Sequence, residues 1–385
     1  MYKIFFSLIV ILFCGSGFLY SQVDQNKTSI IQSGSDRLPE YISEQWTTNN
    51  GLPINHVNQI YQTPDGFIWL ATFTGLVRFD GITFKEFNSG NTPSLPSNRI
   101  TAIQPGDGNT FWINSEQGHL VLYENGEFIS FVDSLSLNMM PGTTNNRIFT
   151  EFDGEQTWIG TGKGLFFFHE RETKPFMPDI FKNKAITAIH KGSDELIRIH
   201  DLDGYLWTIN TNREIVDSIK TVGISGASHI IDDQQGSIWI TRNQIAKIDQ
   251  DGYRTITPPT QFKTEWDQIH PYFLSMKENQ DGEIMVMSLN GLMKIENNEL
   301  VSVDFIDYQS YGTFPEFLGT SFTTCRDTSI WAIVENRVYK NGEFVFSAGA
   351  NGKTIYCDRE DNLWISTMRD GLFRYRKSIL RNITF

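Results

Sequence analysis

The side chains best suited to binding a ligand lie in two long connections that are rich in aromatic residues. Residues 257–272 contain Trp266, and residues 305–317 contain Tyr308 and Tyr311. Flat aromatic rings offer apolar faces on which sugar rings can stack. Long insertions between short elements are commonly functional. These residues predict a site for a sugar or another small ligand, although packing of the same rings against the protein explains them at least as well.

Charged candidates are spread along the rest of the chain. Arg99, Arg147 and Arg369 could hold acidic groups of such a ligand. His56 and His229 stand at the start of corresponding segments, so a ring-shaped fold would place them on the same face. Ordinary histidines of a loop or a core are the alternative interpretation of both.

No motif for catalysis, a metal or a cofactor accompanies these candidates. The seven histidines form no His-Glu-x-x-His pattern, and no Gly-x-Ser-x-Gly elbow is present. The glycine-rich stretch 160–164 lies between two apolar segments and does not open a helix, which argues against a phosphate cradle. We therefore predict no catalytic residue, no metal site and no cofactor, and we predict binding in place of catalysis.

A repeated phrase supplies the framework that must position these residues. It is clearest around Trp69, where a turn, an aromatic-centred strand, a second turn and another strand follow one another. Equivalent anchors recur eight times, and successive anchors are 33 to 46 residues apart, which is about the length of one four-stranded propeller blade. The anchors are Trp69, Trp112, Trp158, Ile197, Trp239, Met285, Trp331 and Trp364.

The first repeat shows how one unit forms a blade. Residues 56–61, 68–72, 76–79 and 83–87 read as four strands joined by short turns, with Asp-Gly pairs at two of the turns. The second strand is apolar without alternation, so we expect it to be covered on both faces. We predict an all-β fold, a β-propeller of eight four-stranded antiparallel blades, with a seven-bladed ring plus one extra unit as the alternative. Either residues 40–46 or residues 379–385 would complete the last blade.

The overall charge limits the class of partner. The formal net charge is −13 and the isoelectric point is about 5.0. An acidic surface does not track phosphate backbones or anionic lipid, so we expect no nucleic acid partner.

The N-terminus predicts export. Lys3 precedes the apolar run 4–14, which is too short to span a bilayer, and polar sequence follows. We expect a signal peptide at 1–21, a leader at 22–39 and the propeller at 40–385. A lipid-modified Cys14 is less consistent, because Phe13 is not small. The mature chain then has no membrane span and lies in the periplasm or outside the cell.

Two cysteines, Cys325 and Cys357, remain after cleavage. They fall at similar places in consecutive repeats. Equivalent points on face-packed sheets lie ~10 Å apart, beyond the ~7 Å that a disulfide allows between Cα atoms. We therefore predict two buried free thiols.

Three stretches define the clearest copy of the repeat: Gly51-Leu-Pro-Ile-Asn-His-Val-Asn-Gln-Ile, Asp65-Gly-Phe-Ile-Trp-Leu-Ala-Thr and Gly75-Leu-Val-Arg-Phe-Asp-Gly. Later copies include Trp158-Ile-Gly-Thr and Trp364-Ile-Ser-Thr. This repeat resembles that of the two-component regulator propellers, the sensor regions of exported bacterial signalling proteins. The resemblance implies a propeller that senses a ligand, often a glycan fragment, outside the inner membrane.

The chain departs from complete family members, in which a transmembrane helix and a kinase or other output domain follow the propellers. We therefore expect either a fragment of a longer sensor or a partner that carries the output, such as a membrane histidine kinase. Our function prediction is a ligand-sensing propeller without its own catalytic activity, which signals by contact. The alternatives are a propeller lyase or glycosidase acting on a polysaccharide, and a scaffold for protein interactions.

Overall fold

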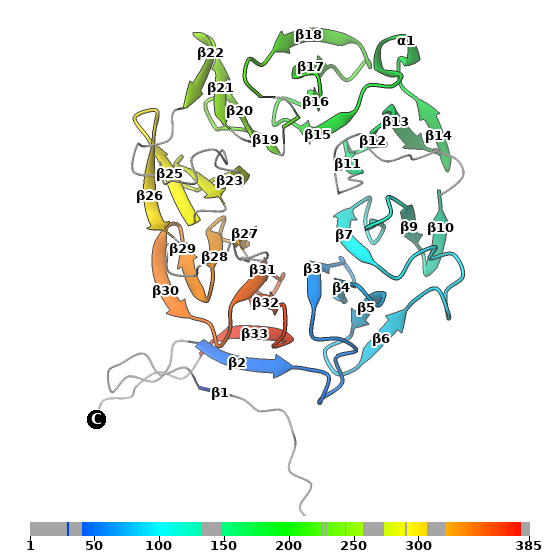
Figure 1. The fold of residues 1–385 in the computed structure, drawn as a ribbon, viewed down its shortest axis with the longest axis vertical. Helices are drawn as coiled ribbons and strands as arrows, with labels where there is room; N and C mark the ends of the chain where they lie inside the picture. Colours follow the sequence, from blue (N-terminus) through cyan, green and yellow to red (C-terminus); the bar gives the residue numbers. More distant parts are fainter. Residues whose placement is uncertain are drawn as a thin grey trace, which may run out of the picture.

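Eight four-stranded antiparallel sheets surround a central axis, as Figure 1 shows. This computed structural model describes residues 29–30, 41–131, 148–224, 226–227, 229–242, 244–256, 273–288, 291–305 and 320–378. In seven blades the chain runs from the innermost strand outwards and each strand pairs with the next, whereas in the eighth the outermost place is taken by a strand from the N-terminus. The predicted fold class is confirmed, and eight blades are present.

The strands of the blades follow the chain order. Blades 1 and 2 contain β3 (Val57–Gln62), β4 (Ile68–Thr72), β5 (Leu76–Phe79), β6 (Phe84–Phe87), β7 (Ile100–Pro105), β8 (Phe111–Ser115), β9 (Leu120–Glu124) and β10 (Glu127–Ser130). Blades 3 and 4 contain β11 (Phe149–Phe152), β12 (Thr157–Thr161), β13 (Gly164–His169), β14 (Glu172–Pro175), β15 (Ile186–Lys191), β16 (Ile197–Asp201), β17 (Tyr205–Ile209) and β18 (Ile215–Lys220), with the short helix α1 (Pro178–Phe181) between these two blades.

The second half of the ring repeats this arrangement. Blades 5 and 6 contain β19 (His229–Asp232), β20 (Ile238–Thr241), β21 (Ile245–Asp249), β22 (Gly252–Ile256), β23 (Phe273–Glu278), β24 (Ile284–Ser288), β25 (Gly291–Glu296) and β26 (Glu299–Phe305). Blades 7 and 8 contain β27 (Thr320–Thr324), β28 (Ile330–Val334), β29 (Arg337–Lys340), β30 (Glu343–Ser347), β31 (Gly352–Cys357), β32 (Leu363–Thr367), β33 (Leu372–Lys377) and β2 (Tyr41–Trp46), with β1 (Ser29–Ile30) at the edge of β2.

The N-terminal strand closes the ring. β2 pairs antiparallel with β33, from Tyr41 opposite Lys377 to Trp46 opposite Leu372. The ring of Trp46 stacks on that of Trp364, with centroids 5.5 Å apart. Glu44 adds ion pairs to two arginines of β33. The outer position of the last blade therefore belongs to β2, and the competing segment 379–385 lies outside the described residues.

The anchor residues of the repeat form the core between blades. Every residue of β4, β8, β12, β28 and β32 is buried, which agrees with the expected cover on both faces. Trp69, for example, packs on Phe111 of the next blade with ring centroids 4.8 Å apart. Ile197 and Met285, which replace tryptophan in the two degenerate copies, are 3% and 1% exposed. They occupy the same buried position, so the count of eight units holds.

Several anchor tryptophans also lock the turn that precedes their strand. The indole Nε1–H donates to a side-chain oxygen of that turn, at its start in four repeats and at its end in the repeat of Trp331, so the buried ring leaves no donor unpaired. Carboxylates at this position accept backbone N–H bonds as well, and Asp233 does so from Gln235 and Ser237. The acceptors are Thr63 for Trp69 (3.2 Å), Asp153 for Trp158 (2.7 Å), Asp233 for Trp239 (2.8 Å), Ser329 for Trp331 (3.0 Å) and Asp358 for Trp364 (2.7 Å).

Innermost strands of neighbouring blades are bridged by polar side chains. The amide of Gln59 in β3 accepts from the backbone N–H of Ile103 (2.8 Å) and donates to its carbonyl (3.0 Å) in β7. Thr323 in β27 accepts from the backbone N–H of Cys357 in β31 (2.9 Å). Radially arranged sheets converge at the axis, so short side chains can span the gap there.

The prediction of free thiols is wrong, because Cys325 and Cys357 form a disulfide with Cα atoms 5.3 Å apart. The ~10 Å spacing applies to sheets that pack face to face. At the inner edge of the ring the sheets converge, and both cysteines lie there, Cys325 just after β27 and Cys357 at the end of β31. The bond joins the innermost strands of blades 7 and 8.

Replacing a turn carboxylate tests the tryptophan lock. Asp233→Ala removes three acceptor bonds and leaves the Nε1–H of Trp239, a residue only 4% exposed, without its partner. We expect a loss of about 2–3 kcal/mol in the free energy of unfolding, measured by urea titration. The control Asp251→Ala, at an exposed turn of the same blade, should change it by less than about 0.5 kcal/mol. Equal effects of the two variants would contradict the lock.

Removing the disulfide tests its contribution to ring closure. The bond links residues 32 positions apart, and loop-closure entropy gives such a crosslink about 3.7 kcal/mol. Cys325→Ser combined with Cys357→Ala should therefore lower the free energy of unfolding by about that amount. Thiol titration of the unfolded wild-type propeller should find neither cysteine free before reduction, and two titratable thiols there would refute the bond.

Candidate functional site

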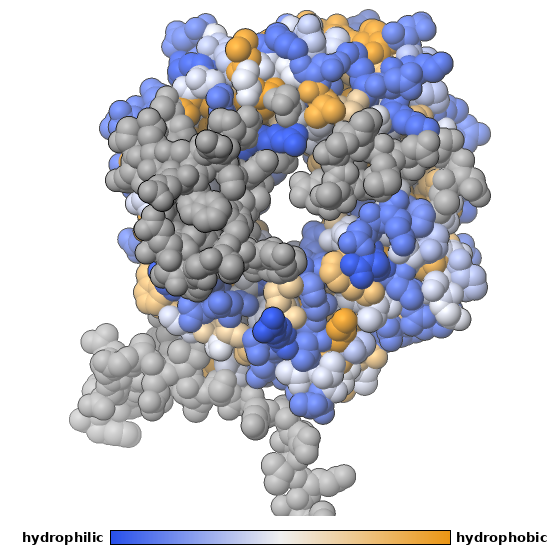
Figure 2. Space-filling view, in the orientation of Figure 1, coloured by the Kyte–Doolittle hydropathy of each residue, from blue (hydrophilic) through white to orange (hydrophobic). Residues whose placement is uncertain are grey.

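Two ends of the ring differ in which connections they carry. Because the blades are antiparallel, the connections between second and third strands lie at the end where each innermost strand begins, which we call the entry end. The connections between first and second and between third and fourth strands lie at the opposite end, which we call the turn end. The space-filling view along the axis shows an opening at the centre of the ring, bordered mainly by hydrophilic residues where the chain is described (Figure 2).

A polar cluster at the entry end joins the last blade to the first. Lys353 in β31 donates from Nζ to Nε2 of His56 (2.7 Å) and to Oδ1 of Asn58 in β3. Asn58 in turn donates from Nδ2 to the carbonyl of Ile100 in β7 (2.7 Å). His56 also forms an isolated parallel bridge with Thr367 at the end of β32. One chain of contacts therefore crosses blades 8, 1 and 2.

An aromatic ring and a second cation complete this cluster. Phe73, in the connection between β4 and β5, lies edge to face with His56, with ring centroids 5.0 Å apart. The guanidinium of Arg99 lies 4.2 Å from the centre of the Phe73 ring, and Lys353 Nζ lies 5.7 Å from it. Arg99 is also ion-paired with Glu116, whose Oε1 is 3.2 Å from Nη2. We call these residues the entry cluster: His56, Asn58, Phe73, Arg99, Glu116 and Lys353.

Burial shifts the titration of the two basic groups that meet in the entry cluster. Desolvation lowers the pKa of Lys353 from 10.5 to about 8. Desolvation, followed by the charge of Lys353, lowers the pKa of His56 as well. At neutral pH the lysine is therefore the donor and the histidine is neutral, with Nε2 as its acceptor. Neither contact neutralises the ammonium charge.

Of the residues predicted to bind a ligand, the structure brings His56 and Arg99 together. Arg369 lies at the same end of the ring, in the connection between β32 and β33. His229 begins β19, so it stands at the entry end as expected, but in blade 5. Trp266, Tyr308, Tyr311 and Arg147 lie outside the described residues.

Sequence reasoning missed Lys353, Asn58, Phe73 and Glu116. A signal for one of them was available, because Lys353 precedes Trp364 by the same number of residues as Asn58 precedes Trp69. A comparison of these equivalent positions would have shown that the last repeat has a lysine, Lys353, where the first repeat has the amide of Asn58. Phe73 looked like part of the repeated phrase, and Glu116 like an ordinary turn carboxylate.

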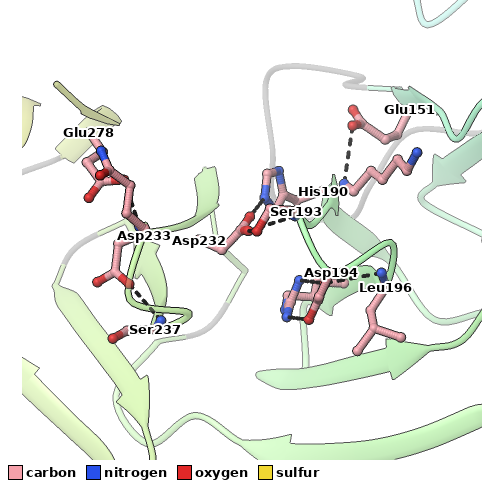
Figure 3. Close-up of polar contacts among 12 residues, drawn as sticks. Glu151, His190, Ser193, Asp194, Leu196, Asp232, Asp233, Ser237 and Glu278 are labelled. Carbon is pink, nitrogen blue, oxygen red and sulfur yellow. Dashed lines mark hydrogen bonds and ion pairs between the residues drawn. The ribbon is translucent and has the colours of Figure 1, made fainter. Parts of the chain in front are cut away.

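A second polar cluster lines the wall of the ring between blades 4 and 5, as Figure 3 shows. His190 in β15 bonds through Nε2 to Oδ1 of Asp232 in β19. The backbone N–H and the hydroxyl of Ser193 donate to the other oxygen of Asp232, at 2.7 and 2.6 Å. Histidine and serine thus converge on one carboxylate. This is not a nucleophile–base pair, in which the hydroxyl would donate to the imidazole.

A small cavity of about 220 Å³ lies beside this second cluster, and Glu151, His190 and His229 are among its lining residues. Burial raises the pKa of Glu151 although its carboxylate accepts the backbone N–H of Lys191 (3.2 Å). Burial lowers the pKa of His229 to about 4, which keeps this imidazole neutral. The lining of the cavity is therefore mixed, with polar side chains such as Gln104 and Thr150 beside apolar ones such as Phe149 and Ile189.

The described residues hold little that could bind a metal ion. One group of three potential ligands lies close together, Cys325, Cys357 and Asp361, and its two cysteines are joined in the disulfide. Within the same described ranges, no helix has the length and apolar character to cross a membrane.

Charge is divided unequally between the two ends of the ring. The connections at the turn end carry 17 acidic and 4 basic residues. The described connections at the entry end, which run between second and third strands and from one blade to the next, carry 5 acidic and 6 basic residues. The difference at the turn end, −13, equals the formal net charge of the whole chain. The entry end is therefore the one that an anion can approach with less repulsion.

Comparison with known proteins identifies the repeat. Residues 51–74 match the sequence family described as two component regulator propeller. A search among curated proteins found no match.

Comparison with solved structures shows the propeller fold. Virginiamycin B lyase from Staphylococcus aureus is 11% identical, with 88% of this chain and 100% of that chain covered and a TM-score of 0.50. The extracellular domain of a putative hybrid two component system from B. thetaiotaomicron is 16% identical, with 91% of this chain but 39% of that chain covered and a TM-score of 0.49. At these identities the likeness extends to the fold alone.

The uncompensated ammonium of Lys353 predicts an unusual effect on stability. A lysine whose pKa is lower in the folded protein binds fewer protons there than in the unfolded chain, so folding is penalised at pH 7 and the penalty disappears above about pH 10. Lys353→Met should raise the free energy of unfolding at pH 7 by about 1 kcal/mol, after allowance for solvent screening of this half-buried group. Urea titrations at pH 7 and pH 10.5 measure this, with Lys340→Met as the control. A variant that is less stable at pH 7 would show that the charge is compensated.

Proposed function

The chain carries the repeat of the two component regulator propellers, and from this premise we propose that it is the exported ligand-sensing part of a two-component-type signalling system. Its ligand is a glycan or another small polar molecule bound at the entry end. It acts outside the inner membrane, after removal of residues 1–21. The output lies in a partner, such as a membrane histidine kinase, or in a continuation of the same polypeptide.

The observation that carries this proposal is the entry cluster. A half-buried lysine that meets a neutral histidine and an amide, beside an aromatic ring and an arginine, is costly for stability. Polar and charged groups held in such an arrangement are characteristic of binding sites. With a pKa of about 8, Lys353 is mostly protonated at pH 7, so the cluster presents a cation to a ligand, which favours binding over catalysis.

Transmission by contact follows from where the entry cluster lies. Lys353 belongs to blade 8, which β2 completes, and His56 and Asn58 belong to the start of blade 1. A ligand that contacts these groups strengthens the junction at which the two ends of the propeller meet. A partner that packs against blades 8 and 1 would sense that change. We propose that Trp266, Tyr308, Tyr311, Arg147 and Arg369 also contribute to binding of the ligand.

An enzyme is the second candidate, and the cluster on the wall of the ring is the observation in its favour. His190 and Asp232 form a pair beside the cavity that Glu151 lines, and the raised pKa of that carboxyl suits a general acid. The fold is shared with a lyase, but fold alone does not carry an activity. Release of new reducing or unsaturated ends from a polysaccharide, abolished by Glu151→Gln, would establish this candidate.

Thermal unfolding in the presence of oligosaccharides tests ligand sensing. A ligand at 100 times its Kd stabilises the folded state by about 2.7 kcal/mol, which is readily detected as a rise in Tm. We expect at least one member of a panel of neutral, uronate and sulfated oligosaccharides to raise Tm. Trp266→Ala or Arg369→Gln should reduce the shift, while Arg171→Gln, at the turn end, should not. A panel without any stabilising member would contradict ligand sensing by this propeller.

A further inference from the structure

We propose that the entry cluster is a subsite for an anionic substituent, a carboxylate or sulfate carried by an oligosaccharide, held between Lys353 and Arg99. The inference rests on the proposed function, because it names the chemistry of the ligand that the propeller senses. It is independent of the long aromatic connections, since every residue that carries it lies in the described part of the chain.

The ammonium of Lys353 carries a charge that its contacts do not balance. Its Nζ donates to His56 and Asn58 and faces the Phe73 ring, and all three partners are neutral. Desolvation disfavours the ammonium, as its lowered pKa shows. A bound anion would supply the missing counter-charge, whereas a neutral sugar would desolvate the ammonium further without compensating it.

Arg99 places a second cation close to Lys353, beside the same ring of Phe73. Its guanidinium lies 4.2 Å from the centre of the ring from which Lys353 Nζ is 5.7 Å away. The two cations therefore lie within ~10 Å of each other, which is about one Debye length at ~0.1 M ionic strength. Glu116 binds one side of the guanidinium through Nε and Nη2, and the contacts of Arg99 with Glu116 leave its Nη1 group available to a ligand. Two cations and one carboxylate leave a net positive charge in the cluster.

His56 is neutral and acts as a hydrogen-bond acceptor for Lys353. Because Nε2 accepts a hydrogen bond from the ammonium of Lys353, the neutral ring carries its own proton on Nδ1. The neutral imidazole therefore positions the ammonium by a hydrogen bond and does not repel it, as an imidazolium would. His56 acts as a positioning residue for Lys353, and Phe73 acts in the same way for Arg99.

The two ends of the ring differ in charge, and the turn end is the more acidic one. The turn end carries 17 acidic against 4 basic residues in its connections, so it repels anions. The entry cluster is a local reversal of sign in a protein whose net charge is −13. An acidic glycan would therefore approach and bind in one orientation, at the entry end.

Isothermal titration calorimetry with matched trisaccharides tests the inference. The probes are trigalacturonate, a singly sulfated galactotriose and neutral galactotriose, each titrated into the full chain without its signal peptide. We expect one or both anionic probes to bind at least 10-fold more tightly than the neutral one. Their affinity should fall with added salt, whereas that of the neutral probe should not.

Two variants locate the site and one serves as control. Lys353→Met and Arg99→Gln should each weaken binding of the anionic probe about 10-fold or more and leave that of the neutral probe within 3-fold. Lys340→Met, at the turn end of blade 7, should change neither. Arg99 is exposed and its replacement tests the site even if a change at Lys353 were to perturb folding.

The outcomes separate this inference from the proposed function. Preference for the uronate, the sulfate or both supports an anionic subsite and identifies its source. Equal binding of neutral and anionic probes, or anionic binding that survives both variants, overturns the inference and leaves ligand sensing intact. If no probe binds and the wider panel of oligosaccharides also raises no Tm, the proposed function fails as well.

Discussion

Convergence of eight sheets on one axis is the constraint on which the rest of the structure depends. Sheets that are separated by large aromatic side chains in their middle must approach one another at their innermost strands. The gap there is bridged by an amide between β3 and β7, by a hydroxyl between β27 and β31, and by the disulfide between blades 7 and 8. Polar bridging at the axis and apolar packing further out are thus two consequences of one geometry.

The same convergence assembles both polar clusters. Lys353 and Asn58 are separated by 295 positions in sequence, yet they meet because blades 8 and 1 are neighbours in the closed ring. His190 and Asp232 meet because their strands occupy the same innermost place in successive blades. Any polar residue near the start or end of an innermost strand is therefore close to residues of the next blade. Clusters of polar and titratable side chains can form in this way without a local sequence motif.

The local repeat was sufficient to predict most of the fold. Tryptophan anchors and turn residues lie within one unit, so the blade, the number of units and the covered second strand follow from short-range pattern. Contacts between different blades were harder to predict. The disulfide was excluded on the spacing of sheets that pack face to face, and the sequence left open whether residues 40–46 or 379–385 complete the last blade. Lys353 was missed because only the closed ring places it beside His56, and Arg99 was proposed from its charge alone.

A ligand sensed at the entry end would tie the last blade to the first. Amide hydrogen exchange, compared between the free protein and the protein saturated with its tightest-binding trisaccharide, measures this effect. We expect slower exchange in residues 55–60, 73–76 and 352–357 and unchanged exchange in the turn connections of blades 3 to 5. Protection confined to the turn end, or binding without protection of blades 8 and 1, would contradict it.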